Sequence, residues 1–262
     1  MSPREEVVRA PAPKIVAPEA LLRRAREYPY AAPPHSYLYD GASANRWRSL
    51  PPDPALLAAR TPVLAAGSNR APERLAQKFA ALFPSARIPV THAHLTGFDS
   101  VYCAHVTSYG SIPATLHPSP GTTVALHVTW LDDKELLCMH ETEQPGINYR
   151  FARLTGLDLV LEDGTRIETA YAYLSTHGAL LDDGKPVALK AIAAQARRFT
   201  SRDQEAMLAA LHKSSRHDGA LDHFLLAMIG ENDACRRLRE ERERLLRGAV
   251  ERFPFETVEI VL

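Results

Sequence analysis

The stretch TPVLAAGSNRAPERLAQKF, residues 61–79, changes from the pattern of a strand to the pattern of a helix at Gly-Ser-Asn. Its first part is an apolar run of strand length. After it, Leu75, Phe79 and Leu82 recur with helical spacing, and Pro72 suits the first turn of a helix. We therefore expect a strand, a tight loop and a helix in direct succession.

The loop between these two elements contains residues that suit a helix start. Gly67 can adopt a positive φ, and Ser68 and Asn69 are good N-cap residues. Backbone N–H groups at a helix start lack partners, so they can bind a carboxylate or a developing oxyanion. A strand–turn–helix without a ligand has the same local features, so this stretch alone leaves both interpretations open.

Length and composition indicate one large domain, or one domain with appendages. Hydrophobic residues make up 45% of the 262 residues and charged residues 24%, as in a globular protein with a sizeable core. Lys plus Arg and Asp plus Glu number 31 each, so the chain has no overall field that would collect nucleic acid or acidic lipid. We expect no nucleic-acid partner.

The chain lacks the patterns of a membrane span and of a secretory signal. Its apolar runs are too short to cross a bilayer, and the segment MSPREEVVRA is charged rather than apolar. Cys103, Cys138 and Cys235 are odd in number and widely spaced, which favours free thiols over a disulfide framework. We expect a soluble, cytoplasmic protein that does not bind membranes.

Composition divides the chain into three parts. Residues 1–60 hold ten of the 20 prolines and several aromatic residues, which indicates an extended arm packed on the core. Residues 61–176 have mostly strand patterns with two helices. Residues 177–262 have the pattern of a helical extension that ends in a strand, with helices expected over residues 186–250.

Shorter patterns predict the limits of individual elements. In the segment TTVALHVTWL, apolar and polar residues alternate as in a strand that buries one face. Asp132 and Glu135 have the spacing of a capping box and predict a helix start, and so do Ser201 and Gln204.

Several segments carry a resemblance when they are taken in chain order. They are AGSN (66–69), IPATLHPSPGTTVALHV (112–128), MHETE (139–143), Tyr149 and AYAYL (170–174). This order resembles the γ-glutamylcyclotransferase family. That family shows a strand ending in Tyr-Gly-Ser-Asn, an A-T-[IL]-x-x-[SP]-P-G segment with alternating apolar residues after it, a helix ending in L-D-x-x-E, and two tyrosines. The resemblance covers residues 61–176.

The resemblance implies an α+β fold, a small mixed β-barrel with flanking helices, to which this chain adds its helical extension. It also implies cleavage of a γ-glutamyl amide, in which the substrate's own α-amine attacks the γ-carbonyl and 5-oxoproline and an amine are released. This chemistry needs no cofactor and no metal, but it needs a group that moves protons. Glu143 matches the family's catalytic glutamate, and enclosure at the barrel mouth would raise its pKa.

The resemblance also implies a set of substrate-binding residues. The loop N–H groups would stabilise the oxyanion, and two tyrosines would line the site. The set is Ala66, Gly67, Ser68, Asn69, Tyr149 and Tyr173. The expected partner is a small γ-glutamyl compound whose leaving amine stays unidentified, and the helical extension could also join copies of the chain into a homo-oligomer.

This chain departs from the family pattern at several positions. Ala66 stands where the family has tyrosine, and Met139 and His140 stand where it has Leu and Asp. Asn69 separates the chain from a branch that acts on glutathione, which has Gly-Ser-Leu. Two functions stay open: an enzyme of the family type, favoured by Glu143, and a non-catalytic small-molecule binding or interaction module, favoured by Ala66.

Other kinds of site have weaker support in the sequence. His92 and His94 would share one strand face and could bind a metal, but ordinary half-buried strand histidines explain them better, and we expect no metal. The loop after the first strand lacks the G-x-S-x-G spacing of a serine hydrolase and the glycine pattern of a nucleotide site.

Overall fold

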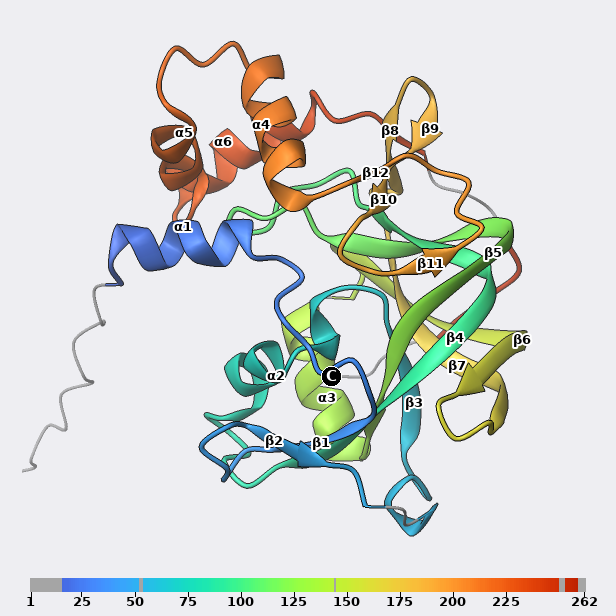
Figure 1. Cartoon of the computed structure of the whole chain (residues 1–262). Coiled ribbons are helices and arrows are strands. Elements are labelled where there is room, and N and C mark those ends of the chain that lie inside the picture. Colours follow the sequence, from blue (N-terminus) through green and yellow to red (C-terminus); the bar gives the residue numbers. More distant parts are fainter. Residues whose placement is uncertain (1–15, 52–53, 144, 250–252, 259–262) are drawn as a thin grey trace, which may run out of the picture.

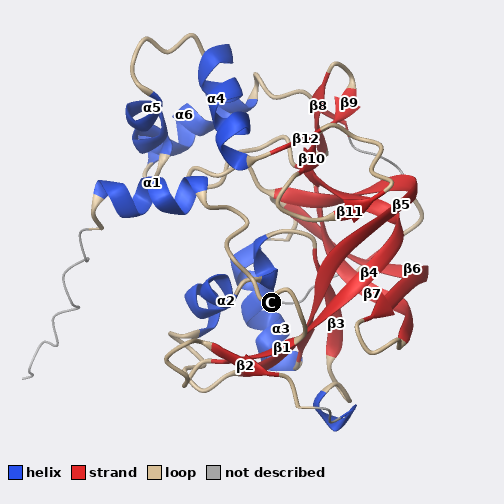
Figure 2. Ribbon diagram, in the orientation of Figure 1, coloured by secondary structure: helices blue, strands red, loops and turns tan. Residues whose placement is uncertain are grey.

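The computed structural model describes residues 16–51, 54–143, 145–249 and 253–258, which form a β-barrel with two groups of helices around it (Figures 1 and 2). The helices are α1 (Pro18–Arg26), α2 (Pro72–Phe79), α3 (Asp133–Glu143), α4 (Gln204–Ser214), α5 (Leu221–Met228) and α6 (Asp233–Glu243). The longer strands are β1 (Tyr37–Asp40), β3 (Thr61–Ala65), β4 (Arg87–Tyr102), β5 (Ala114–Leu131), β6 (Tyr149–Leu161), β7 (Arg166–Ser175) and β8 (Ala179–Asp182). The short strands are β2 (Trp47–Ser49), β9 (Lys185–Pro186), β10 (Ala188–Leu189), β11 (Ala194–Gln195), β12 (Ser201–Arg202), β13 (Gly248–Ala249) and β14 (Glu256–Thr257). Two 3₁₀ turns, η1 (Pro54–Leu56) and η2 (Ser68–Arg70), complete the described elements.

Five strands close the barrel. β3 pairs with β5, β5 with β4, β4 with β6, and β6 with β7, and all four pairs are antiparallel. The parallel pairing of β7 with β3 closes the ring. The mixed β-barrel with flanking helices that the sequence predicts is therefore confirmed.

The alternation along β5 places one face of this strand inside the barrel. Val124, Leu126 and Val128 are fully buried in the interior cluster, as the sequence pattern predicts. On the opposite face of β5, His127 and Thr129 are buried while Thr123 and Ala125 are half-buried, and the N-terminal segment reaches His127. There, Nε2 of His127 lies 3.1 Å from the carbonyl oxygen of Pro33.

Helices α2 and α3 pack side by side on the outside of the barrel. A second apolar cluster lies under them and includes Leu75, Phe79 and Met139. The predicted capping box at the start of α3 is confirmed. The N–H of Asp132 donates to Glu135 Oε2, and the N–H of Glu135 donates to Asp132 Oδ1, both at 2.9 Å.

Residues 16–51 contribute to two distant parts of the molecule. Strand β1 pairs with the start of β4 and extends the sheet beside the barrel. Helix α1 lies with α4 and α5 in the upper helical group of Figure 1. It is far from β1, the next element in the chain. Arg26 of α1 forms ion pairs with Glu205 (2.9 Å) and with Asp222 (2.6 Å), which join α1 to α4 and α5.

The expectation of helices throughout residues 186–250 is wrong for the first part of that range. Before α4, the short strands β10 and β11 pair with parts of β4 and β5 that extend beyond their pairing with β6 and β3, so these strands organise this segment instead of helical hydrogen bonds. The capping box of Ser201 and Gln204 is also wrong. Asp203 caps α4 by accepting a hydrogen bond from the N–H of Ala206 (2.9 Å).

Further sequence expectations concern the cysteines and the ends of the chain. Cys103, Cys138 and Cys235 are free, as expected. Part of the expected C-terminal strand is present as β14, which pairs with β6. Residues 259–262 of that strand and residues 1–15 of the arm lie outside the described residues. In the part of the chain that the structure describes, no helix has the length and apolarity to span a bilayer.

A buried ion pair fixes the segment after β11 to the barrel, and its removal should destabilise the fold. Arg197 donates to both carboxylate oxygens of Asp99 (2.9 and 3.0 Å), and the Asp99 side chain is fully buried. We expect Arg197→Met to lower the free energy of unfolding by about 3–5 kcal/mol, because it leaves a buried carboxylate without its cationic partner.

Urea unfolding of the variant measures this loss. The matched control is Arg166→Met, which breaks the exposed pair of Arg166 with Asp158 and should cost less than about 1 kcal/mol. Equal losses in the two variants would contradict the structural role given to Arg197.

Candidate active site

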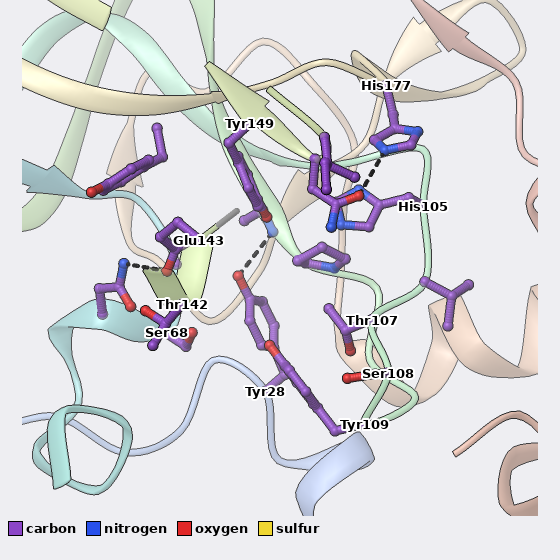
Figure 3. Close-up of a pocket in the computed structure, with 18 of the residues that line it drawn as sticks. Tyr28, Ser68, His105, Thr107, Ser108, Tyr109, Thr142, Glu143, Tyr149 and His177 are labelled. Atoms are coloured by element: carbon purple, nitrogen blue, oxygen red, sulfur yellow. Dashed lines mark hydrogen bonds between the residues drawn. The ribbon is translucent and has the colours of Figure 1, made fainter. Parts of the chain in front are cut away.

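A cavity of about 720 Å³ lies at the end of the barrel where β3 and β7 end and where β5 and β6 begin (Figure 3). The loop after β3, the end of α3 and residues 105–109 form its walls, and α1 and α6 contribute to it. Every residue that the sequence assigns to the site lines this cavity. These residues are Ala66, Gly67, Ser68, Asn69, Glu143, Tyr149 and Tyr173. The structure brings the set together, and the role of each residue stays a prediction.

Tyr28 determines the need for glycine in the loop after β3. The φ of Gly67 is −138°, so the expected positive φ is wrong. A Cβ at this position would instead overlap the hydroxyl of Tyr28, whose oxygen accepts a hydrogen bond from the N–H of Ala114 (2.8 Å). Glycine is required because an aromatic side chain from the N-terminal segment occupies the space beside it.

Helix α2 begins without the side-chain cap that the sequence predicts. Its N-cap residue is Ala71, and Ser68 opens the 3₁₀ turn η2. Asn69 turns its side chain toward α3, where Nδ2 donates to Glu143 Oε1 (3.1 Å). Asn69 therefore contributes to the wall of the cavity and not to the helix start.

Glu143 forms a buried ion pair with Lys78 of α2. The Nζ of Lys78 donates to Glu143 Oε1 and to Thr142 Oγ1 (2.8 Å), and it lies 3.3 Å from Met139 Sδ. The side chains of Lys78 and Glu143 are only 1% and 13% exposed, so water solvates neither charge well. The pair joins α2 to the end of α3 at the cavity wall.

The pKa of Glu143 moves in the direction opposite to the expected one. Burial raises the pKa of this carboxyl, but Lys78, Arg74 and Asn69 together outweigh burial and hold it below its ordinary value. Burial lowers the pKa of Lys78 to about 8, against the opposing effect of Glu143. Both groups are therefore charged at neutral pH. The prediction fails because it considered the burial of Glu143 and left out its partner Lys78.

The other titratable groups that face Glu143 are uncharged at neutral pH. Burial raises the pKa values of four tyrosines and one cysteine around it. These are Tyr28, Tyr109, Tyr149, Tyr173 and Cys103. Because these groups keep their protons, Lys78 is the ion-pair partner that balances the charge of Glu143, while Arg74 acts on that charge without an ion-pair contact.

His140, which stands where the resembling family has aspartate, holds one of the two site tyrosines. The hydroxyl oxygen of Tyr173 lies within hydrogen-bond distance of His140 Nδ1 (2.7 Å), and burial lowers the pKa of His140. The ring of Tyr149 lies edge-on to that of Tyr173 and beside Glu143 in Figure 3. His140 therefore positions Tyr173 from behind the cavity wall.

Two histidines line the cavity away from Glu143. His105 is 3% exposed, its Nδ1 has no hydrogen-bond partner, and burial lowers its pKa to about 3. Its ring lies 4.6 Å from that of His177, whose Nε2 donates to Asn148 Oδ1 (3.1 Å). The neutral imidazole of His105 can therefore exchange hydrogen bonds with a ligand but carries no charge. The described residues include no group of three or more His, Cys, Asp or Glu that could hold a metal ion.

Sequence reasoning missed Lys78 and Tyr28. Lys78 follows Leu75 by three residues and directly precedes Phe79, so it falls on the apolar face of α2. A lysine on the apolar face of a helix is a signal of a buried charge that needs a partner. Tyr28 lies in the arm that the sequence expects to pack on the core, but local spacing gives no indication of its contact with Gly67.

Comparisons with known proteins were made for sequence and for structure. No family model matches this chain, and no curated protein is similar to it. Similar solved structures include a gamma-glutamyl cyclotransferase, with 16% identity over 71% of this chain and 99% of that chain and a TM-score of 0.36.

Two further solved structures are similar to this chain. One is a protein of Arabidopsis thaliana, with 17% identity over 60% of this chain and 85% of that chain and a TM-score of 0.37. The other is an uncharacterised protein of Homo sapiens, with 17% identity over 71% of this chain and 99% of that chain and a TM-score of 0.37. The strand pairing defines the barrel, and the residues that line the cavity carry the chemistry.

The contact between Gly67 and Tyr28 generates a prediction about stability. Gly67→Ala should lower the free energy of unfolding by about 1–3 kcal/mol, because the new Cβ displaces the Tyr28 hydroxyl from its bond to Ala114. Urea unfolding measures the loss in the wild-type background and again in the Tyr28→Phe background, where the clashing oxygen is absent.

The loss should shrink by about 1 kcal/mol or more in the Tyr28→Phe background, since residues in contact couple. An unchanged loss would mean that Gly67 is required for its backbone conformation and not for the space that Tyr28 fills.

Proposed function

We propose that this chain cleaves a γ-glutamyl amide by intramolecular attack and releases 5-oxoproline and an amine. The observation that carries the proposal is the carboxylate of Glu143 at the cavity wall, bonded to Asn69 of the loop that follows β3. A cyclising substrate needs a proton acceptor and nearby donors for its carbonyl oxygen. Glu143 is the proposed acceptor, and the loop after β3 provides the proposed donors.

The reaction divides into proton transfers and one exchange of bonds. The α-ammonium of the substrate gives a proton to Glu143, and the amine nitrogen attacks the γ-carbonyl to form a five-membered ring with an oxyanion. The bond from carbon to the amide nitrogen then breaks, and that nitrogen takes the proton back from Glu143. The ring nitrogen gives its second proton to the carboxylate of Glu143, which passes it to the released amine, so that the products are the neutral lactam and an ammonium ion. The N–H groups of Gly67, Ser68 and Asn69 are the proposed donors to the oxyanion.

The ion pair of Lys78 with Glu143 suits the second half of this cycle better than the first. A carboxyl whose pKa lies below the ordinary range accepts a proton at a cost, but it is ionised at neutral pH and returns that proton readily to a leaving amine. Its negative charge also attracts the substrate's α-ammonium into the cavity.

Tyr28 supports the enzymatic proposal at the position where the family pattern is broken. Ala66 removes the tyrosine that the family has before Gly-Ser-Asn. In this chain the N-terminal segment brings another phenol to the same loop, since the hydroxyl of Tyr28 lies against Gly67 and both residues line the cavity. Ala66 therefore does not leave the site without an aromatic hydroxyl.

A non-catalytic binding module is the second candidate, and the same ion pair favours it. Lys78 neutralises Glu143 inside the protein, so the carboxylate would recognise an ammonium group without accepting its proton. In that case the cavity would hold a γ-glutamyl compound and leave it intact. Turnover separates the two candidates.

Release of 5-oxoproline from a panel of γ-glutamyl amides tests the proposal. We expect at least one amide to be cleaved, and Glu143→Gln to lower kcat by about 10²–10⁴-fold, because the amide keeps the shape of the side chain but cannot transfer the proton. The matched control is Asp133→Asn, which changes an exposed carboxylate at the other end of the same helix, away from the cavity, and should stay within about threefold of wild type.

Binding of the uncleaved amides to the same proteins completes the test. Binding without release from any amide would favour the binding module. Release that persists in Glu143→Gln would contradict the role of Glu143 and assign the proton transfer to another group.

A further inference from the structure

A pair of arginines shares one aromatic ring at the wall of the cavity. The guanidinium carbon of Arg24 in α1 lies 4.6 Å from the ring centre of Tyr109, and that of Arg74 in α2 lies 5.3 Å from the same centre. All three residues line the cavity. Figure 3 shows Tyr109 beside Tyr28, with its segment running along the cavity. This cluster of Arg24, Arg74 and Tyr109 takes no part in the proposed reaction.

Neither arginine has a carboxylate partner within residues 16–51, 54–143, 145–249 and 253–258. Arg74 donates to the amide oxygen of Gln77 (3.1 Å), and the Nε atoms of both arginines are buried without a hydrogen-bond partner. Glu143, whose charge acts on Arg74, already has Lys78 as its ion-pair partner.

Another arginine at the same cavity has the acidic neighbours that this cluster lacks. Arg236 of α6 pairs with Asp233 (2.6 Å) and with Glu240 (3.9 Å). Its charge is neutralised within its own helix. Arg236 therefore differs from Arg24 and Arg74, because its charge is balanced by carboxylates of its own helix and theirs is not.

The cluster has an excess of positive charge that its tyrosine does not balance. Burial raises the pKa of Tyr109, so its phenol stays neutral and stacks on the two guanidinium groups without cancelling their charge. Two like charges on one ring repel each other, and an anion placed between them would remove that repulsion. Planar guanidinium groups bind carboxylates and phosphates with two parallel hydrogen bonds.

We propose that Arg24 and Arg74, held on the ring of Tyr109, bind a carboxylate or phosphate carried by the part of the substrate that leaves as the amine. The inference rests on the proposed function. The cyclising glutamyl group places its α-amine at Glu143 and its γ-carbonyl at the loop after β3. Its α-carboxylate is common to every γ-glutamyl amide, whereas the anion that we assign to Arg24 and Arg74 belongs to the other half of the substrate. The chain is then specific for acidic amines and rejects polyamines.

Binding of matched ligands tests this inference. Calorimetry is carried out on full-length Glu143→Gln protein, in which turnover is blocked. The acidic ligands are γ-glutamyl amides of glycine, 4-aminobutyrate, 6-aminohexanoate and 2-aminoethyl phosphate. Each is compared with the alkyl amide that lacks its acidic group, namely the methyl, propyl, pentyl and ethyl amide, so that chain length and anion type are separated.

We expect at least one acidic amide to bind about 10–100-fold more tightly than its alkyl partner, the range of one or two charge-assisted hydrogen bonds. Arg24→Gln and Arg74→Gln should each reduce this preference by about tenfold, and Arg236→Gln should keep it. Melting temperatures identify variants that do not fold. Arg24→Lys and Arg74→Lys keep the positive charge but lose the planar guanidinium that can form two parallel hydrogen bonds. Their preference for acidic amides should lie between that of the parent protein and that of the glutamine variants.

Two outcomes would overturn the inference while the proposed function stands. In the first, acidic and alkyl amides bind alike at every length. In the second, the arginine variants weaken all amides equally, which would mean that the arginines hold the α-carboxylate common to every ligand.

A separate titration distinguishes failure of the inference from failure of the proposed function. If no γ-glutamyl amide binds, glutarate and inorganic phosphate are titrated into the same proteins. Binding that depends on Arg24 and Arg74 would keep the anion site and overturn the γ-glutamyl substrate. No binding of either anion would overturn both.

Discussion

The ion pair between Lys78 and Glu143 is the interaction on which the architecture of the cavity depends. It places two opposite charges at the junction of α2 and α3, where almost no water reaches them. Removing either partner would leave an uncompensated buried charge, which costs several kcal/mol. Thr142 and Asn69 also bond to the pair, so the end of α3 and the loop after β3 share one hydrogen-bonded unit. Loss of the ion pair would therefore also weaken the hydrogen bonds that hold this wall of the cavity together.

Segments from both ends of the described chain complete the cavity around this unit. Tyr28 comes from the region before the barrel and fills the space beside Gly67. Residues of α6 line the cavity from the opposite side, and Glu243 of this helix accepts a hydrogen bond from the N–H of Val106 in the cavity wall (2.8 Å). The barrel provides the positions of the central residues, while these flanking segments provide the surfaces that a substrate's outer half would meet.

The features that the sequence predicted correctly are those with local or repeating signals. The alternation of β5 and the capping box of Asp132 and Glu135 are set by nearest neighbours along the chain, and both occur in the structure. The order of the motifs also predicted that Glu143 and Tyr149 would meet at one cavity. The alternation and the capping box are predicted correctly because each depends on only a few adjacent residues.

The features that the sequence did not predict depend on contacts between distant segments. Asn69 has the chemistry of a helix cap, yet it bonds to a carboxylate 74 positions later in the chain. Lys78 reverses the direction in which burial alone would move the pKa of Glu143. The segment before α4 forms strands because β4 and β5 offer hydrogen bonds to it. In each case a partner that no local pattern reveals outweighs the local preference.

The protonation state of Glu143 tests most directly whether Lys78 controls this site. Infrared difference spectra between wild type and Glu143→Gln, recorded across a pH series, isolate the carboxyl of this residue. With Lys78 present, the band should be that of a carboxylate at neutral pH and should titrate below the ordinary range of a glutamate. In the Lys78→Met background, the largest opponent of burial is gone, so the midpoint should move upward. A protonated carboxyl at neutral pH in the wild type, or the same midpoint in both backgrounds, would contradict the control of Glu143 by Lys78.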